Sequence, residues 1–225
     1  MKTTTRLLLA LFVATPMLAA EWIGWTIPTR SSTRVNYRGN DNYCAGSGRL
    51  VLAVRMDGDV VEDLRFFDPV CEPGFDGLAI EMRTMTPEAS IDWLVAHLGT
   101  ADDEKELVTA IALHEDDKVV PTLIPLARNN PERDVRRQAI FWLGQKAGAK
   151  AAAELRRAVD EDPDDEVRQH AVFAISQLPQ DRSVPMLIEL IKTHKSRKVR
   201  ERAMFWLAQT DDPRALDLIE SILTR

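Results

Sequence analysis

The sequence predicts a mainly α-helical protein, in which a right-handed α-solenoid of four to five helical hairpins follows a small β-rich domain linked by a disulfide. Three observations predict it. An eleven-residue phrase recurs every 32 residues, the first 85 residues lack that period and alternate β-type runs with turns, and both cysteines lie in this first part. The predicted organisation is a signal peptide at 1–20, the β-rich domain at 21–85 and the solenoid at 86–225.

The recurring phrase reads VRRQAIFWLGQ at 135–145, VRQHAVFAISQ at 167–177 and VRERAMFWLAQ at 199–209. Its Val, the Ala four residues on and the Leu or Ile eight residues on share one face of a helix. A second apolar stripe precedes each copy and has the same interval. We call the preceding helix A and the helix of the phrase B. The period is unbroken from residue 86 to 225, which predicts four A–B pairs and a fifth A helix.

The segment DVRRQAIFWL contains the pattern Asp-Val-Arg-x-x-Ala-x-x-x-Leu, which resembles the short HEAT-type repeats found in phycobilisome lyases. The resemblance covers about residues 86–225. It implies a solenoid whose B helices line the concave surface. Proteins with such repeats include chromophore lyases, a di-iron hydroxylase and interaction scaffolds. Together with the head that precedes the repeats, the chain is similar to other exported bacterial HEAT-repeat proteins.

Residues 21–85 carry the β-type signals. Asp57-Gly58 lies between two β-rich runs and is typical of a hairpin turn. Residues 78–85 predict a third strand, and EWIGWTIPTR at 21–30 offers another. A solenoid's first hairpin has no neighbour on one side, so we expect this sheet to cover it. An independent binding role for the head is the alternative.

The first twenty residues predict export. They combine the basic residues Lys2 and Arg6 with an apolar run too short to span a bilayer and small residues at 19–20. Cleavage there predicts a periplasmic or secreted protein with no remaining membrane span, and it removes two positive charges, taking the net charge from −6 to −8. In an exported chain, Cys44 and Cys71 predict a disulfide, with two free thiols as the alternative. So acidic a chain is a poor nucleic-acid binder.

The B phrase also carries residues that packing does not require. We call the helix face formed by the Val, Ala and Leu or Ile positions the packed arc. The phenylalanines fall on the side of the helix away from this arc, and two polar columns lie beside them. Aromatic rings with amides alongside suit an extended peptide, so we expect a binding surface there. The alternative is that neighbouring atoms cover the rings. The predicted binding residues are Phe141, Phe173 and Phe205, with Gln145, Gln177, Gln209, Gln138, His170 and Arg202.

One polar column falls inside the packed arc. It holds Arg136, Arg168 and Arg200, for which we expect a structural role, with the guanidinium groups paired to acids such as Asp134 and Glu166. The alternative is a row of arginines that binds a ligand.

No catalytic, cofactor or metal motif emerges from the sequence. The four histidines fall in different repeats, and His114-Glu115 lacks the partner pairs that a di-iron hydroxylase uses. We therefore expect a non-catalytic scaffold or adaptor of the cell envelope that binds a protein or peptide. The rival is an enzyme, or an enzyme subunit, with a site between the head and the first repeats, formed by Asp57, Asp59, His97 and His114.

A third possibility is an architectural protein that self-associates weakly through its C-terminal helix. The face that would pack on another copy carries Leu216, Ile219 and Leu223.

Overall fold

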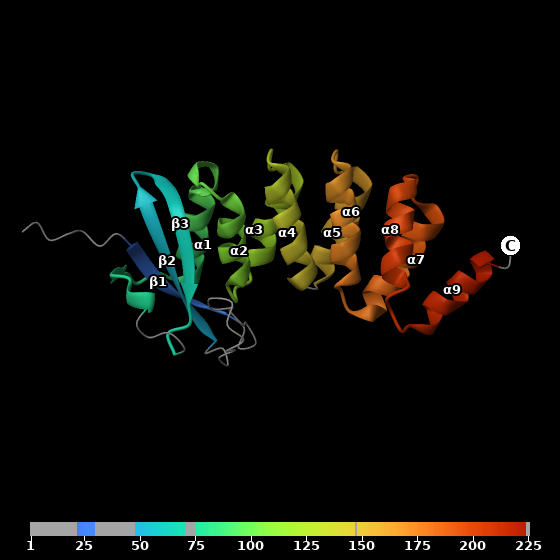
Figure 1. The fold of residues 1–225 in the computed structure, drawn as a ribbon, viewed down its shortest axis with the longest axis horizontal. Coiled ribbons are helices and arrows are strands. Elements are labelled where there is room, and N and C mark those ends of the chain that lie inside the picture. The colour runs from blue at the N-terminus through green and yellow to red at the C-terminus, as the bar shows by residue number, and fades with distance from the viewer. Residues whose placement is uncertain (1–21, 30–47, 71–74, 147, 224–225) are drawn as a thin grey trace, which may run out of the picture.

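The fold is known from a computed structural model, which describes residues 22–29, 48–70, 75–146 and 148–223. A β-sheet forms one end of an elongated molecule, and the helices follow in a row towards the C-terminus (Figure 1). The predicted signal peptide, Cys44 and Cys71 lie outside the described residues.

The sheet has the strand order β3-β2-β1-β4. Its strands are β1 (Trp22–Pro28), β2 (Arg49–Asp57), β3 (Val60–Phe67) and β4 (Ile80–Met82). The predicted hairpin joins β2 to β3, and Gly58 in its turn has a φ of 57°, which favours glycine. The strand expected over 78–85 is reduced to three residues, and they pair in parallel with β1.

The sheet packs against the first helical pair, α1 (Pro87–Ala96) and α2 (Glu104–Leu113). Trp25 is fully buried in the core that also holds Ile91 of α1. Two main-chain bonds fix the sheet: the Glu115 amide donates to the Pro28 carbonyl at 2.9 Å, and the Asp102 amide donates to Val61 at 3.0 Å. The sheet therefore covers the face of the first pair that a preceding repeat would otherwise bury.

The remaining helices follow the predicted period. They are α3 (Val119–Asn129), α4 (Arg133–Lys146), α5 (Ala149–Glu161), α6 (Asp165–Ser176), α7 (Gln180–Thr193), α8 (Arg197–Leu207) and α9 (Pro213–Leu223). Two short 3₁₀ turns are η1 (Phe75–Gly77) and η2 (Leu98–Thr100). Odd-numbered α-helices are A helices and even-numbered ones are B helices, so the mainly helical, solenoid-like arrangement is confirmed.

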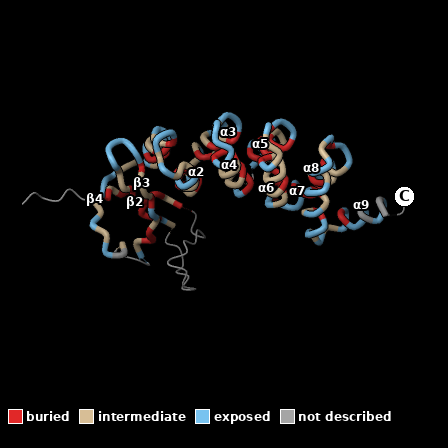
Figure 2. The backbone as a smooth tube through the Cα atoms, turned by 45° about the horizontal axis from the view of Figure 1, so that its top comes forward, coloured by how far each residue is buried: buried red, intermediate tan, exposed pale blue. Residues whose placement is uncertain are grey.

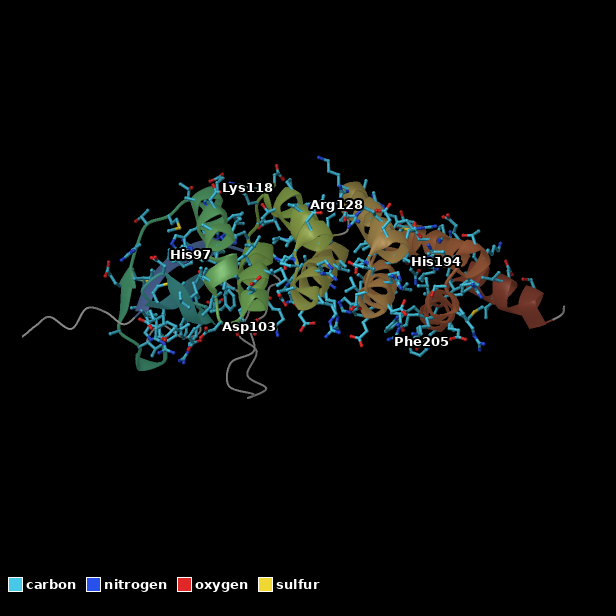
Figure 3. The ribbon with its side chains drawn as sticks, turned by 90° about the horizontal axis from the view of Figure 1, so that it is seen from above. His97, Asp103, Lys118, Arg128, His194 and Phe205 are labelled. Atoms are coloured by element: carbon cyan, nitrogen blue, oxygen red, sulfur yellow. The ribbon has the colours of Figure 1, made fainter. Side chains whose placement is uncertain are left out.

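The helices form two layers. Each A helix contacts the B helix that follows it, and α2, α4, α6 and α8 contact one another in series. In Figure 3, Lys118 and Arg128 beside and on α3 lie along one side of the molecule, and Asp103 and Phe205 of the B layer lie along the other. Figure 2 shows buried segments recurring along the row of helices, and they form one core from Trp25 to Leu218.

The arginine column holds the loops between A and B helices. The Nη1 atoms of Arg136 and Arg200 donate to carbonyls six residues earlier, Asn130 at 3.0 Å and His194 at 2.7 Å. Arg168 donates to Asp162 in the same way. The expected structural role therefore holds, because each guanidinium satisfies carbonyls at a loop.

The prediction of which acids pair with this arginine column was wrong. The Nε atom of Arg136 donates to the Oδ2 atom of Asp162 in the next repeat at 3.0 Å, and both side chains are buried. Asp134 pairs instead with arginines of its own helix, Arg133 and Arg137. The helix period places Arg136 in the packed arc, but it does not show which acid the adjacent loop brings there.

Helices α4 and α6 approach each other closely at Gly144 of α4. A Cβ atom added there would lie 2.9 Å from the Ala174 carbonyl oxygen and 3.1 Å from the Ala174 Cβ of α6. Ala174 occupies the column that holds Trp142 and Trp206 in the neighbouring repeats. Small residues therefore meet between the two tryptophans, and they let α4 and α6 pack closely.

We expect Gly144→Ala to lower the free energy of unfolding by about 1–3 kcal/mol, because the added methyl group would overpack this contact. On helix propensity alone the same change would raise stability by about 1 kcal/mol. Urea unfolding measures the difference. Gly99→Ala is the matched control, since a Cβ atom there meets nothing within 4 Å. A stabilised Gly144→Ala variant would contradict the close approach.

Candidate functional site

The three phenylalanines of the B phrase come from successive B helices, α4, α6 and α8. Phe205 is 50 % exposed, whereas Phe141 and Phe173 are half-buried. Figure 3 shows Phe205 on the side of the molecule opposite Lys118 and Arg128, which is the B-helix side. The column therefore presents ring surface, and most of it lies at its C-terminal end.

Two tryptophans extend this column into a row of rings. Trp206 lies between Phe173 and Phe205, with ring centroids 5.0 Å from each. Phe141 meets Trp142 edge to face at 5.3 Å. The structure places both tryptophans half-buried at the edge of the core. They belong to the candidate site, and their adjacency to the Phe column in each phrase was the available signal.

The three glutamines that follow the rings, Gln145, Gln177 and Gln209, are exposed. The amide of Gln177 donates to the Ser176 hydroxyl at 3.1 Å. Gln138 lies in the other polar column and is half-buried, because its amide donates to the Thr109 hydroxyl at 2.8 Å. The column of Gln145, Gln177 and Gln209 is thus exposed in all three repeats, whereas the Gln138 amide already has a hydrogen-bond partner within the protein.

The Thr109 hydroxyl has a second donor, the Trp142 Nε1 atom at 3.4 Å. Two 32-residue repeats further on, Phe173 takes the position that corresponds to Thr109, and Trp206 that of Trp142. The Trp206 Nε1 atom is buried and has no hydrogen-bond partner among the described residues. The Phe173 ring therefore stands where the earlier repeat has the Thr109 hydroxyl as an acceptor.

His170 lies beside the rings, with its centroid 5.6 Å from that of Phe173. Burial, and then the positive charges of Arg137 and Arg202, lower the pKa of His170 from 6.5 to about 4. The imidazole is therefore neutral at pH 7. Arg202 of α8 is exposed.

A pocket of about 210 Å³ opens on the B helices next to His170. Its lining residues are Lys105, Asp134, Arg137, Gln138 and His170. The Arg137 Nη1 atom lies 3.6 Å from an Asp134 oxygen, which is long for a hydrogen bond. The Arg137 Nε atom is buried without a hydrogen-bond partner among the described residues.

Of the rival enzyme site, Asp59 and His97 are linked by the Thr100 hydroxyl, which donates to both of their carbonyls, whereas His114 contacts the other end of α1. Asp57 and Asp59 are exposed at the β2–β3 turn. His97 follows α1, where its ring stacks on Trp93 at 3.9 Å. His114 follows α2 and contacts Ser90 in the first turn of α1, seven residues before His97, which corresponds to a rise of about 10 Å along the helix.

Both ring nitrogens of His114 have hydrogen-bond partners within the protein. The Nδ1 atom lies 2.8 Å from the Ala110 carbonyl and the Nε2 atom 2.9 Å from the Ser90 hydroxyl, which accepts a hydrogen bond from Trp25 Nε1 at 2.6 Å. Burial lowers the pKa of His114. A neutral imidazole that donates from Nδ1 and accepts at Nε2 satisfies this chain, which links β1, α1 and α2.

A larger cleft, of about 910 Å³, lies between the loop after α2 and the start of α5. Its charged groups are Glu115, Asp116, Asp117, Lys146 and Lys150. His114 borders this cleft, and its carbonyl accepts from the Lys146 Nζ atom at 3.2 Å. The sequence analysis did not single out this cleft.

At the C-terminal end, Leu216 of α9 is 62 % exposed. The side chains of Ile219 and Leu223, which we expected on the same face, lie outside the described residues. Within the described ranges, no helix is both long and apolar enough to cross a bilayer. In the same part of the chain, no three His, Cys, Asp or Glu side chains are placed to hold a metal ion.

Comparison with known families adds one finding. A family model described as HEAT repeats matches three overlapping segments, residues 91–176, 120–203 and 152–225, which together span more than half of the chain. No curated protein matches the sequence.

Proposed function

The chain belongs to the HEAT-repeat family, and we propose that it is a non-catalytic scaffold of the cell envelope that binds an extended segment of another protein along its B helices. HEAT repeats are generally protein-interaction scaffolds, which supports a protein partner. Export to the periplasm or beyond is part of the proposal, and its support is the signal-like composition of residues 1–20.

The proposal rests on the row of aromatic rings along the B helices. Packing explains the Val, Ala and Leu columns, all of which are buried. It does not explain a phenylalanine that is 50 % exposed and touches a half-buried tryptophan. Aromatic side chains offer large apolar area at low conformational cost, and they are enriched where proteins bind one another. The exposed amides of Gln145, Gln177 and Gln209 can donate to and accept from an extended main chain.

Phe205→Ala tests the surface with little effect on the fold, because half of this side chain is already exposed. We expect the melting temperature to stay within a few degrees and partner binding to weaken about tenfold or more, since aromatic residues at the centre of an interface contribute about 2 kcal/mol or more. The measurement is quantitative capture of interacting proteins from the native envelope by wild type and variant in parallel.

Phe173→Thr is a second, independent variant. It copies the Thr109–Trp142 pair by placing a hydroxyl where Trp206 Nε1 lacks an acceptor, and it removes the ring. We expect the fold to be retained and binding to be lost. Val95→Ser is a control, because Val95 is an exposed apolar residue of the A helix α1. Equal capture by wild type and both phenylalanine variants would exclude this face as the binding surface.

A further inference from the structure

The charge around His170 differs in sign from that of the whole chain, which has a formal net charge of −6. The two charges that act on the His170 ring belong to Arg137 of α4 and Arg202 of α8, and both are positive. Arg202 is exposed and forms no ion pair within the described part of the chain. The pocket beside His170 is lined by Lys105 and Arg137 against one carboxylate, Asp134, so the B-helix surface carries a net positive charge at this point.

Arg137 leaves donor capacity unused. Its nearest carboxylate, Asp134, is 3.6 Å away, and its buried Nε atom has no partner among the described residues. The Arg137 side chain is 39 % exposed and lines the pocket, so its outer guanidinium N–H groups can donate to an incoming anion. The pocket of about 210 Å³ beside it has room for a carboxylate group.

The other side of the ring row carries exposed amides over three repeats, and its charged residue on α4, Lys146, donates to the His114 carbonyl. The B-helix residues that follow the rings there include Gln145, Ser176, Gln177, Ala208 and Gln209. The surface thus has a positive edge, a row of rings and an amide edge. A ligand that matches it carries its negative charge on one side of an apolar group.

The spacing fits an extended chain. The His170 and Phe173 ring centroids are 5.6 Å apart, and the Trp206 centroid is 5.0 Å from that of Phe173. Side chains two residues apart on one face of an extended strand are separated by roughly 6.5–7 Å. An acidic residue at His170 would therefore place the side chain two residues away over the rings.

We propose that the partner segment is an acidic peptide, in which an Asp or Glu binds between Arg137 and Arg202 beside His170 and an aromatic or large aliphatic residue two positions away lies on Phe173, Trp206 and Phe205. This inference rests on the proposed function and specifies its ligand. The carboxylate accepts hydrogen bonds from guanidinium groups, and the apolar residue covers exposed ring surface.

The test is selection of random twelve-residue peptides, displayed on phage, by the full chain at low salt. Three variants are selected in parallel: Arg202→Gln, Phe173→Thr and Lys192→Gln. Lys192 is exposed on the A helix α7, so its variant controls for the loss of one positive charge. Individual peptides are then resynthesised with Glu or Gln at the acidic position, and their affinities are measured by fluorescence anisotropy.

We expect wild type and Lys192→Gln to enrich peptides with an acid two positions from an aromatic or aliphatic residue. The Glu form of a selected peptide should bind about 3–10-fold more tightly than its Gln form, with the difference shrinking in 1 M salt and in Arg202→Gln. Enriched peptides without an acid, or equal affinities of the Glu and Gln forms, would overturn the acidic ligand but leave the binding surface in place. No enrichment over Phe173→Thr would overturn the proposed function itself.

Discussion

Replacing Arg136 by Met is expected to lower the free energy of unfolding by about 3–5 kcal/mol. The change removes one partner of a buried ion pair, and Asp162 keeps its charge in a site where it is 3 % exposed. It also leaves the carbonyls of Asn130 and Pro131 without their donor. Urea unfolding followed by circular dichroism measures the effect.

Two further variants show whether the buried charge is the cause. Arg200→Met removes the equivalent arginine of a later repeat, which binds only loop carbonyls, and we expect a loss of about 1–2 kcal/mol. Adding Asp162→Asn to Arg136→Met neutralises the buried carboxylate and keeps an acceptor for the Asp164 amide, so the double variant should regain part of the stability. Equal losses in Arg136→Met and Arg200→Met would show that the ion pair contributes nothing.

Acidification from pH 7 to 5.5 is expected to destabilise the protein through His114 and His170. His114 and His170 have folded pKa values below 6.5, the value expected in the unfolded chain. The unfolded state therefore binds protons first as the pH falls, and stability decreases below about pH 6.5. Each histidine contributes a slope of at most about 1.4 kcal/mol per pH unit. For His170, the loss continues to about pH 4.

His170→Gln separates the two histidines, because Gln is the residue that the preceding repeat carries at this position. Since His170 is partly solvated, screening reduces its expected contribution to about 1–2 kcal/mol. The variant should lose part of the pH dependence, and the part due to His114 at the sheet–helix junction should remain. Urea titrations at closely spaced pH values give the slopes. A wild-type stability that does not change over this range would contradict the burial of both rings.

The repeat could be predicted closely because its period is a local property. Val, Ala and Leu at four-residue intervals define one helix face, and a constant 32-residue interval requires each pair to pack on the last in the same way. The hairpin at Asp57-Gly58 is equally local, since the turn residues sit next to each other in the chain. The export of the protein and the disulfide between Cys44 and Cys71 remain predictions.

Contacts across repeats could not be predicted in the same way. The helical angle places Arg136 in the packed arc, but its partner Asp162 is 26 residues away and lies in a loop of the next repeat. Nor does the helical angle show that Trp142 and Trp206 lie half-buried at the edge of the core, where Trp206 contacts Phe173.

The sequence by itself determined the period, the division into A and B helices and the columns of rings, amides and arginines, because these follow from which residue types recur along a single helix. Only the tertiary structure decided which loop acid pairs with which arginine, how far each ring is exposed, and that Arg137 and Arg202 act on the same histidine. Those relations depend on the distance and angle between neighbouring helices, which are set by the side chains packed between them.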